Sequence, residues 1–247
     1  MKILRSIPSK GIKPAVETYS VPTVKGMTVL DSLLYVKEHL DHSVSFRHSC
    51  RMGNCGSCSM VVNGSPRLTC QTQVIELGTK EVEVRPLENF PVIRDLVCDF
   101  NEFYDKHRRV KPYLIRRDKA EEENPTSEYL QSRKELDRYI QFALCIKCGL
   151  CFHACPITST DIRYLGPQAL SQAYRYLADS RDEDNSERIE AVDTRDGCWG
   201  CHLAESCSEA CPKGVDPSLG IQLLRRMVIA SQHRIGKKAE PRLRFMR

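Results

Sequence analysis

The sequence predicts two unlike domains, an α+β domain followed by an all-α domain. Short alternating segments and an Asn-Gly turn lie in the first hundred residues, whereas helix-capping signals and helical periodicity predominate after residue 130. The 13 cysteines fall mostly into three groups, one in the first part and two in the second. A chain of 247 residues is long enough for each domain to bury a core.

The first part is predicted to form a mixed sheet crossed by one helix. Residues 1–7 and 17–21 have strand character, residues 61–68 form a hairpin around Asn63-Gly64, and the alternation at 81–84 predicts an edge strand. Between them, Val29, Leu33, Val36 and Leu40 recur at helical spacing behind Thr28 as N-cap.

The second part is predicted to be helical. A helix over 95–110 carries Cys98 as a core thiol, and a charged segment precedes Ser132, which forms a capping box with Glu135. An apolar stripe then leads from residue 136 to 144, and two more helices start at Pro167 and Pro217. We therefore expect a first domain over 1–110, a linker over 111–131 and a helical domain over 132–247.

The charge is concentrated at the C-terminal end. Residues 225–247 hold eight Arg or Lys against Glu240, a net +7, which leaves −2 for the remainder. This tail lacks the repeated aromatic residues that stack on nucleic-acid bases, so no nucleic-acid partner is predicted. A solvated tail and attraction to an acidic membrane surface both remain open.

The cysteine count argues against a disulfide framework, because 13 thiols cannot all pair. We find no secretory signal pattern and no apolar run of membrane-spanning length. The expectation is a soluble chain in a reducing compartment, where thiolates stay available for metal.

Two cysteine runs in the second part have the spacing of two-cluster ferredoxins. CIKCGLCFHACP at 145–156 follows the pattern C-x2-C-x2-C-x3-C-P, and CHLAESCSEACP at 201–212 repeats it with Ala204 in the second ligand place. In such runs the fourth cysteine serves the other cluster. The pattern predicts a 4Fe-4S cluster on Cys145, Cys148, Cys151 and Cys211, and a 3Fe-4S cluster on Cys155, Cys201 and Cys207.

Zinc is the alternative, with Cys145, Cys148, Cys198 and Cys201 as a four-thiolate site. It leaves four cysteines and both Cys-Pro endings unexplained, so we favour iron–sulfur clusters. Cys198 does not match the vacated place at Ala204; a buried thiol near the cluster is the favoured role, and a fourth ligand is the alternative.

The first part carries its own set, Cys50, Cys55, Cys58 and Cys70, in the C-x4-C-x2-C…C spacing of plant-type 2Fe-2S sites. Gly53 and Gly56 would let this loop turn tightly and direct backbone N–H groups at sulfur. The fold class is thus an α+β plant-type, β-grasp-like ferredoxin domain followed by an all-α bacterial-ferredoxin-like two-cluster domain.

Together these features resemble the iron–sulfur subunit of succinate dehydrogenase and fumarate reductase over nearly the whole chain. The resemblance rests on SCRMGNCGSC at 49–58, PVIRDLV at 91–97, KPY at 111–113, CIKCGLCFHACP at 145–156 and CPKG at 211–214. It implies three clusters in series between an FAD-carrying flavoprotein subunit and a quinone beside membrane anchor subunits. It also implies a peripheral position on the cytoplasmic face of the cell membrane.

Ubiquinone-reducing members resemble one another in a tryptophan shortly after the first Cys-Pro, where this chain has Ile157 to Thr160. His202 matches a family residue near the quinone, and Arg225 stands where the family often has a basic side chain; surface solvation or helix capping is the alternative for both.

We find no Gly-rich dinucleotide turn and no acid–base pair, so dicarboxylate chemistry is assigned to the partner subunit. Two other functions remain open. One is a soluble ferredoxin-like carrier without a fixed enzyme partner. The other is the iron–sulfur subunit of a thiol-dependent fumarate reductase, which predicts a further cysteine-rich domain that these 247 residues do not carry.

Overall fold

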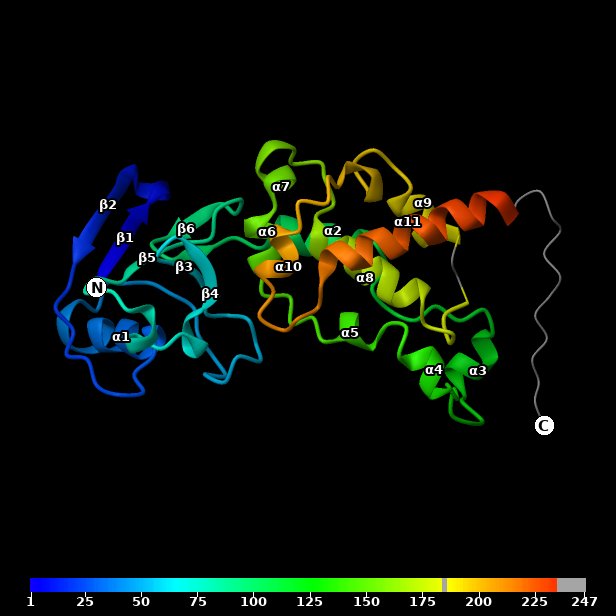
Figure 1. The fold of residues 1–247 in the computed structure, drawn as a ribbon, viewed down its shortest axis with the longest axis horizontal. Coiled ribbons are helices and arrows are strands. Elements are labelled where there is room, and N and C mark those ends of the chain that lie inside the picture. Colours follow the sequence, from blue (N-terminus) through cyan, green and yellow to red (C-terminus); the bar gives the residue numbers. More distant parts are fainter. Residues whose placement is uncertain (184–185, 235–247) are drawn as a thin grey trace.

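The structure is a computed structural model that describes residues 1–183 and 186–234. Figure 1 shows an elongated molecule with strands gathered at one end and helices at the other. The basic tail beyond residue 234, which the sequence singled out by its charge, lies outside the described residues. The predicted order of an α+β part followed by a helical part is confirmed.

The first domain is built on a five-stranded mixed sheet. Its strands are β1 (Lys2–Ile7), β2 (Ile12–Thr18), β3 (Ser59–Val62), β4 (Ser65–Leu68) and β5 (Glu83–Arg85). Their spatial order is β2-β1-β5-β3-β4, and only β1 and β5 run parallel. The prediction of an edge strand at 81–84 is therefore wrong. Alternation reports which face of a strand is buried, and it carries no information about neighbours on either side.

Helix α1 (Val29–Tyr35) covers one face of this sheet. The predicted capping box is present, because the Asp31 N–H donates to the Thr28 side chain while Asp31 accepts from the Thr28 N–H. Val29 and Leu33 are buried against Ile3 of β1. The helix continues as a π-helical turn over Val36–Leu40.

The predicted helix over 95–110 begins only at α2 (Asn101–Arg109). Before it lies a small hairpin of β6 (Val92–Arg94) and β7 (Val97–Cys98), so Cys98 is on a strand and its assignment to a helix is wrong, although its thiol is buried as predicted. The hairpin forms in place of the first helical turns because of contacts with distant segments. The buried Asp95 carboxylate accepts N–H groups from Ser6 and Ser45, which fastens the hairpin to the rest of the domain.

Helices form the second domain, within the described residues. They are α3 (Lys119–Glu123), α4 (Arg133–Leu136), α5 (Ile140–Ala143), α6 (Leu150–Ala154), α7 (Pro156–Thr160), α8 (Pro167–Leu177), α9 (Ser186–Val192), α10 (Ser206–Glu209) and α11 (Pro217–Arg234). The starts at Pro167 and Pro217 and the Ser132–Glu135 capping box are confirmed. The apolar stripe from 136 to 144 is divided between α4 and α5. Helix α11 packs along α8, as Figure 1 shows.

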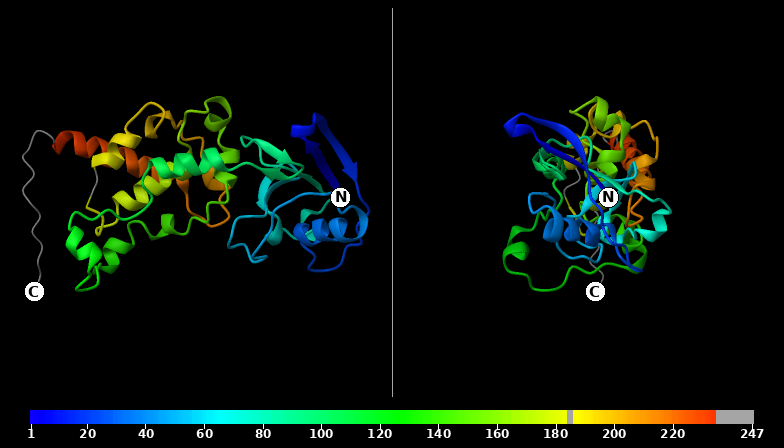
Figure 2. Two further views of the ribbon diagram at one scale, coloured as in Figure 1. Left: turned by 180° about the vertical axis from the view of Figure 1, so that it is seen from behind. Right: turned by 90° about the vertical axis from the view of Figure 1, so that its left-hand side faces the viewer.

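Residues 111–131 are held against the helical domain. The buried Arg188 donates to the backbone carbonyls of Val110, Lys111 and Tyr113 and pairs with the buried Asp182 carboxylate at 2.9 Å. Asp182 in turn accepts the Ile115 N–H. Figure 2 shows the same segment from behind, beside the far end of the helical domain.

An aromatic cluster joins the two domains. Phe90, Phe100 and Phe103 stack or tilt against one another, and Phe152 of α6 packs onto two of them with ring centroids 5.1 and 5.6 Å away. The Asn89 amide donates to the carbonyls of Phe152 and His153. Because aromatic packing and hydrogen bonds both cross the boundary, the cysteine loops of the two domains are held in one arrangement.

Candidate metal centres

The cysteine loop of the first domain gathers all four predicted thiols. The N–H groups of Asn54 and Cys55 donate to the Cys50 sulfur at 3.2 Å, and the Gly53 N–H donates to the Cys70 sulfur at 3.3 Å. Cys70 lies close enough to Cys58 to contribute to the raised pKa of the Cys58 thiol. The predicted inward turn of backbone N–H groups is thus present, and it favours sulfur in its negatively charged form.

Both glycines of this loop are sterically required. Gly53 and Gly56 have φ of +68° and +73°, in the left-handed region. A Cβ at Gly53 would lie 2.8 Å from the Gln71 side chain, and a Cβ at Gly56 would lie 2.9 Å from Cys148 of the second domain. Any larger residue would push the loop away from its neighbours.

Cys55 and Cys58 differ in how readily they ionise. Partial burial opposes ionisation of Cys55, but hydrogen bonds from Ser57 and from the Cys50 N–H outweigh it and lower its pKa to about 6. Burial, with the adjacent Cys70, raises the pKa of Cys58 to about 11. A bound cation would favour the thiolate form of Cys58.

The first predicted set of the second domain lines one cavity. Cys145, Cys148, Cys151 and Cys211 converge there, although Cys211 comes from a loop sixty residues away from the others. Lys147 and Gly149 adopt positive φ between these cysteines, so the chain can wrap around a compact object. The Val215 N–H donates to the Cys211 sulfur at 3.4 Å.

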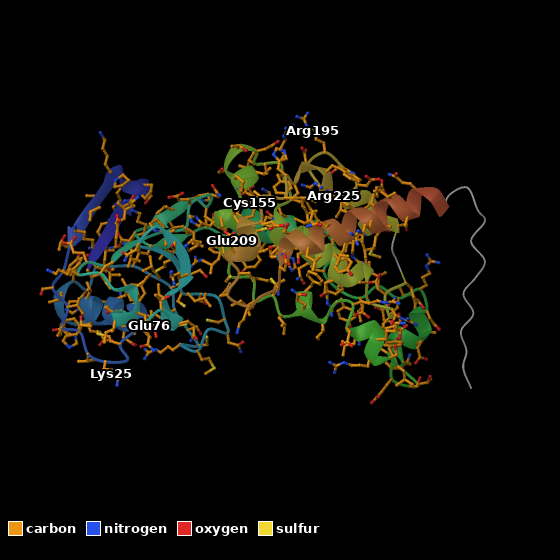
Figure 3. The ribbon with its side chains drawn as sticks, in the orientation of Figure 1. Lys25, Glu76, Cys155, Arg195, Glu209 and Arg225 are labelled. Carbon is orange, nitrogen blue, oxygen red and sulfur yellow. The ribbon has the colours of Figure 1, made fainter. Side chains whose placement is uncertain are left out.

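The second predicted set lines a separate cavity, together with Ala204. Cys155, Cys201 and Cys207 face it, and the Leu203 N–H donates to the Cys201 sulfur at 3.3 Å. Cys151 lies in the first turn of α6 and Cys155 at its C-cap, a separation of about 6 Å along the helix. One helical turn thus serves both cavities. Figure 3 labels Cys155 in this part of the helical domain.

Burial opposes ionisation of one thiol in each cavity. It raises the pKa of Cys148 to about 11 and that of Cys207 to about 12, and neighbouring thiols add to both shifts. A bound cation would favour the thiolate form of both, which suits iron ligation.

The geometry does not match a single zinc ion. Among residues 1–183 and 186–234, no three Cys, His, Asp or Glu side chains are grouped closely enough to hold one metal ion, and this holds for the predicted iron–sulfur sets as well. The four thiols of the zinc alternative are also divided: Cys145 and Cys148 line one cavity, Cys201 lines the other, and Cys198 is buried in the helical core.

Arg225 of α11 is hydrogen-bonded to the turn that contains Cys198, beside the second cavity. The Arg225 guanidinium donates to the carbonyls of Cys198 and Cys201 at 2.9 and 2.5 Å and lies 5.5 Å from the Trp199 ring centroid. Its side chain therefore holds the backbone that carries Cys201. His202, by contrast, is exposed at the rim of the cavity. Figure 3 shows Arg225 on α11.

Four polar side chains that sequence reasoning missed face the two cavities. Tyr164 and Ser218 line the cavity of Cys155, and Gln168 and Ser171 line the cavity of Cys145; each has a buried polar atom without a hydrogen-bond partner in the described chain. Native proteins leave few such atoms unpaired. Thiols on the walls can ligate iron, and the unpaired polar groups can form hydrogen bonds with sulfur, so the lining of both cavities suits an iron–sulfur cluster. No spacing rule signals these four residues, because folding alone brings them to the walls.

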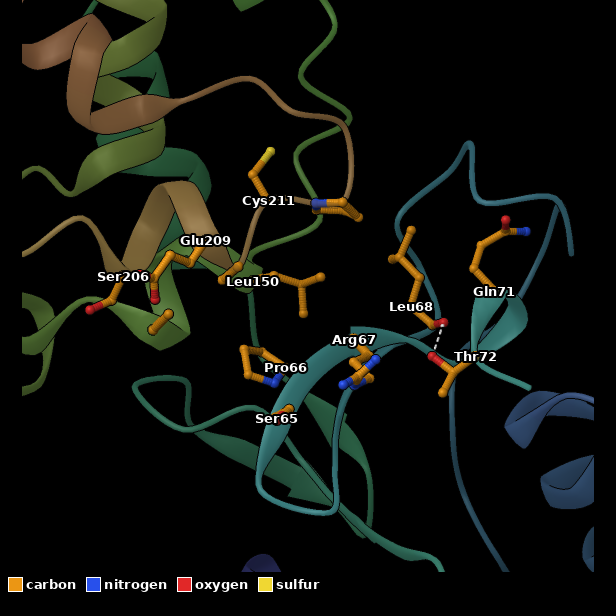
Figure 4. Close-up of a pocket in the computed structure, with 13 residues that line it drawn as sticks. Ser65, Pro66, Arg67, Leu68, Gln71, Thr72, Leu150, Ser206, Glu209 and Cys211 are labelled. Carbon is orange, nitrogen blue, oxygen red and sulfur yellow. Dashed lines mark hydrogen bonds between the residues drawn. The ribbon is translucent and has the colours of Figure 1, made fainter. Parts of the chain in front are cut away.

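A larger groove lies between the domains. It measures about 580 Å³ and separates β4 and the Thr69–Gln71 turn from α6 and α10, as Figure 4 shows. Arg67 and Glu209 stand on opposite walls, and the Thr72 hydroxyl donates to the Leu68 carbonyl on one side. Cys211 is the only cysteine among the lining residues, so the groove is distinct from the two thiol-lined cavities.

Comparison with protein families agrees with this division. Residues 1–105 match the family described as "2Fe-2S iron-sulfur cluster binding domain", and residues 141–215 match "4Fe-4S dicluster domain". Fold and sites therefore define a two-domain iron–sulfur protein of the electron-transfer class.

Relatives over almost the full length narrow the class. The chain is 44% identical over 241 residues to a fumarate reductase iron-sulfur subunit of Mycobacterium tuberculosis, covering 98% of this chain and 96% of that protein. It is 39% identical over 232 residues to a succinate dehydrogenase iron-sulfur subunit of Paracoccus denitrificans, covering 92% and 86%. The chain belongs to the family of iron–sulfur subunits of fumarate reductase and succinate dehydrogenase.

A solved structure shares the architecture. A chain of the Mycobacterium smegmatis Sdh1 complex in the apo form superposes with a TM-score of 0.84 at 26% identity, covering 94% of this chain and 95% of that one.

Proposed function

We propose that this protein is the electron-transfer subunit of a membrane-bound succinate dehydrogenase or fumarate reductase. It would pass electrons between an FAD-carrying flavoprotein subunit and quinone. Bound clusters supply one-electron transfer, and the chain holds them at fixed spacing and adjusts their potentials. The observation that carries the proposal is the meeting of the Cys50 loop, through Gly56, with the cavity of Cys148, and the sharing of α6 by the two cavities beyond it.

The same geometry supports the proposed ligand sets. Cys50, Cys55, Cys58 and Cys70 would bind 2Fe-2S in a β-grasp-like domain of residues 1–110. Beyond a connecting segment over 111–131, the helical domain would bind 4Fe-4S through Cys145, Cys148, Cys151 and Cys211. Ala204 presents a methyl group to the remaining cavity, so Cys155, Cys201 and Cys207 would hold 3Fe-4S.

The quinone end is assigned to the surface beside the 3Fe-4S cavity. His202 is exposed there and can donate or accept a proton or hydrogen bond toward a bound quinone. Arg225 would not face the quinone directly, because its guanidinium donates hydrogen bonds to the Cys198 and Cys201 carbonyls. Its role would be to hold the turn that carries Cys201. The quinone would therefore meet His202 first.

Partners complete the proposed assembly. A flavoprotein subunit would dock near the first domain, and integral anchor subunits would hold the 3Fe-4S end at the cytoplasmic face of the cell membrane. No helix in the described ranges is long and apolar enough to cross a bilayer. No nucleic-acid partner is proposed.

Purification of the native complex tests this function. The expected result is a stable co-purifying flavoprotein, and succinate should reduce the clusters detected by EPR. A chain that purifies alone, with clusters that neither succinate nor quinol reduces and neither fumarate nor quinone oxidises, would support the soluble carrier instead. A partner that contains a cysteine-rich domain would indicate the thiol-dependent fumarate reductase.

A further inference from the structure

Two buried hydroxyl groups line the cavity of Cys155, Cys201 and Cys207 without a hydrogen-bond partner in the described chain. They belong to Tyr164 and Ser218. Leaving a buried polar group unpaired is destabilising, so a fold that buries two in one small cavity indicates a partner there.

Tyr164 is placed firmly. It is 1% exposed and precedes α8, and its ring packs so closely on Gly200 that a Cβ there would lie 3.0 Å from it. Its hydroxyl shares this cavity with the thiols of Cys155, Cys201 and Cys207, so it can donate a hydrogen bond to sulfur held there.

Ser218 enters the cavity from a different element. It lies in the first turn of α11 and is 2% exposed. Its backbone N–H is satisfied by the Ser208 hydroxyl at 3.1 Å, whereas its own hydroxyl oxygen has no partner in the described chain. The other walls include Ile157, Leu203 and Ile221, and an apolar lining strengthens any hydrogen bond made inside.

We infer that the hydroxyls of Tyr164 and Ser218 donate hydrogen bonds to sulfur atoms of the cluster held by Cys155, Cys201 and Cys207, and thereby raise its midpoint potential. This rests on the proposed function of that cavity. Reduction adds one electron, and the cluster becomes more negative. Donors stabilise the more negative state more strongly, and no proton needs to move. The two hydroxyls would thus favour electron arrival at the quinone end.

The test uses the intact complex with Tyr164→Phe, Ser218→Ala or both, and follows the EPR signal of the oxidised three-iron cluster during a redox titration. At the midpoint potential of the wild-type cluster, half of the three-iron clusters are oxidised and half are reduced. We expect each single variant to raise the oxidised-to-reduced ratio several-fold, and the double variant to raise it further. A tenfold change corresponds to 59 mV for one electron. Unmoved midpoints in both single variants would overturn the inference.

Matched controls separate hydrogen bonding from disturbance of the fold. Tyr174→Phe removes another buried hydroxyl of this domain, but one that donates to the Arg138 carbonyl, so the midpoint should not move. Ser218→Thr retains a hydroxyl and should keep the wild-type midpoint. If it shifts as far as Ser218→Ala, the hydroxyl is not responsible and the inference fails.

The same titration distinguishes this inference from the proposed function. A wild-type complex without any oxidised three-iron signal would remove the cluster assignment itself. A normal three-iron signal whose midpoint potential is the same in the wild type and in both hydroxyl variants would contradict only the proposed hydrogen bonds. If Tyr164→Phe fails to retain the cluster, the comparison of Ser218→Ala with Ser218→Thr decides the matter alone.

Discussion

A Cβ built on Gly56 would lie 2.9 Å from the Cys148 Cα, so the cysteine loop of the first domain meets the second domain backbone to backbone. Gly56 lies between Cys55 and Cys58, and Cys148 belongs to the next set of thiols. The loops that would hold the two proposed clusters are therefore in direct contact. Because electron transfer slows steeply with distance, this contact is expected to set the rate between them.

Replacement of Gly56 by alanine should separate the two loops. The left-handed φ costs about 1–2 kcal/mol and the clash adds about 1–3 kcal/mol. We expect slower reduction of the 4Fe-4S cluster by the 2Fe-2S cluster, measured by freeze-quench EPR after succinate addition, and a lower unfolding midpoint.

Gly64 provides the matched control. It has φ of +77° in the Asn63-Gly64 turn, but a Cβ there meets nothing within 4 Å. Gly64→Ala should carry the backbone cost alone and leave electron transfer unchanged. Equal rates in the Gly56 and Gly64 variants would contradict the importance of the contact.

Ala204→Cys should convert the three-iron site into a four-iron site. The side chain faces the same cavity as Cys155, Cys201 and Cys207, and a thiolate there can bind a fourth iron. We expect one additional iron per chain, loss of the oxidised EPR signal and a lower potential, because the added ligand makes the cluster more negative. The rate of quinone reduction by the complex should then fall.

Cys198→Ser tests the competing ligand. Since Cys198 is buried in the helical core outside the cavity lining, this change should alter neither iron content nor the oxidised signal. If the wild-type protein lacks that signal and Cys198→Ser reveals it, Cys198 is the fourth ligand and the site is a 4Fe-4S centre.

Asp182→Ala should destabilise the helical domain strongly. The variant removes the Asp182 carboxylate, which pairs with the buried Arg188 and accepts the Ile115 N–H. Loss of one partner of a buried pair typically costs about 3–5 kcal/mol. Denaturant unfolding of the purified complex measures this. Asp137→Ala, which removes an exposed pair with Arg133, should cost under about 1 kcal/mol.

Arg225→Lys should loosen the turn that carries Cys201. Lysine cannot reproduce two directed N–H bonds to the Cys198 and Cys201 carbonyls or the stacking on Trp199. The expected outcome is partial loss of the three-iron signal, by EPR spin counting, with the other two clusters intact. Arg226→Lys, at the exposed neighbouring position, should keep full occupancy; an equal loss there would refute the positioning role.

Local sequence predicted the features that depend on near neighbours. The Thr28–Asp31 and Ser132–Glu135 capping boxes and the helix starts at Pro167 and Pro217 all formed as predicted, because caps and proline act within one turn. The cysteine spacings also predicted which thiols converge, since a cluster binds short loops whose spacing is determined by its own size.

The tertiary structure decided what depends on distant segments. It placed β5 in the middle of the sheet, put Cys98 on a strand and turned Arg225 toward the backbone. It also brought Tyr164, Ser218, Gln168 and Ser171 to the cavity walls. The spacing of residues along the sequence does not predict such positions, because packing between segments far apart in the chain determines which side chains face a shared cavity. The sequence by itself thus determined the sets of thiols and the order of the domains, and only folding determined what surrounds each set.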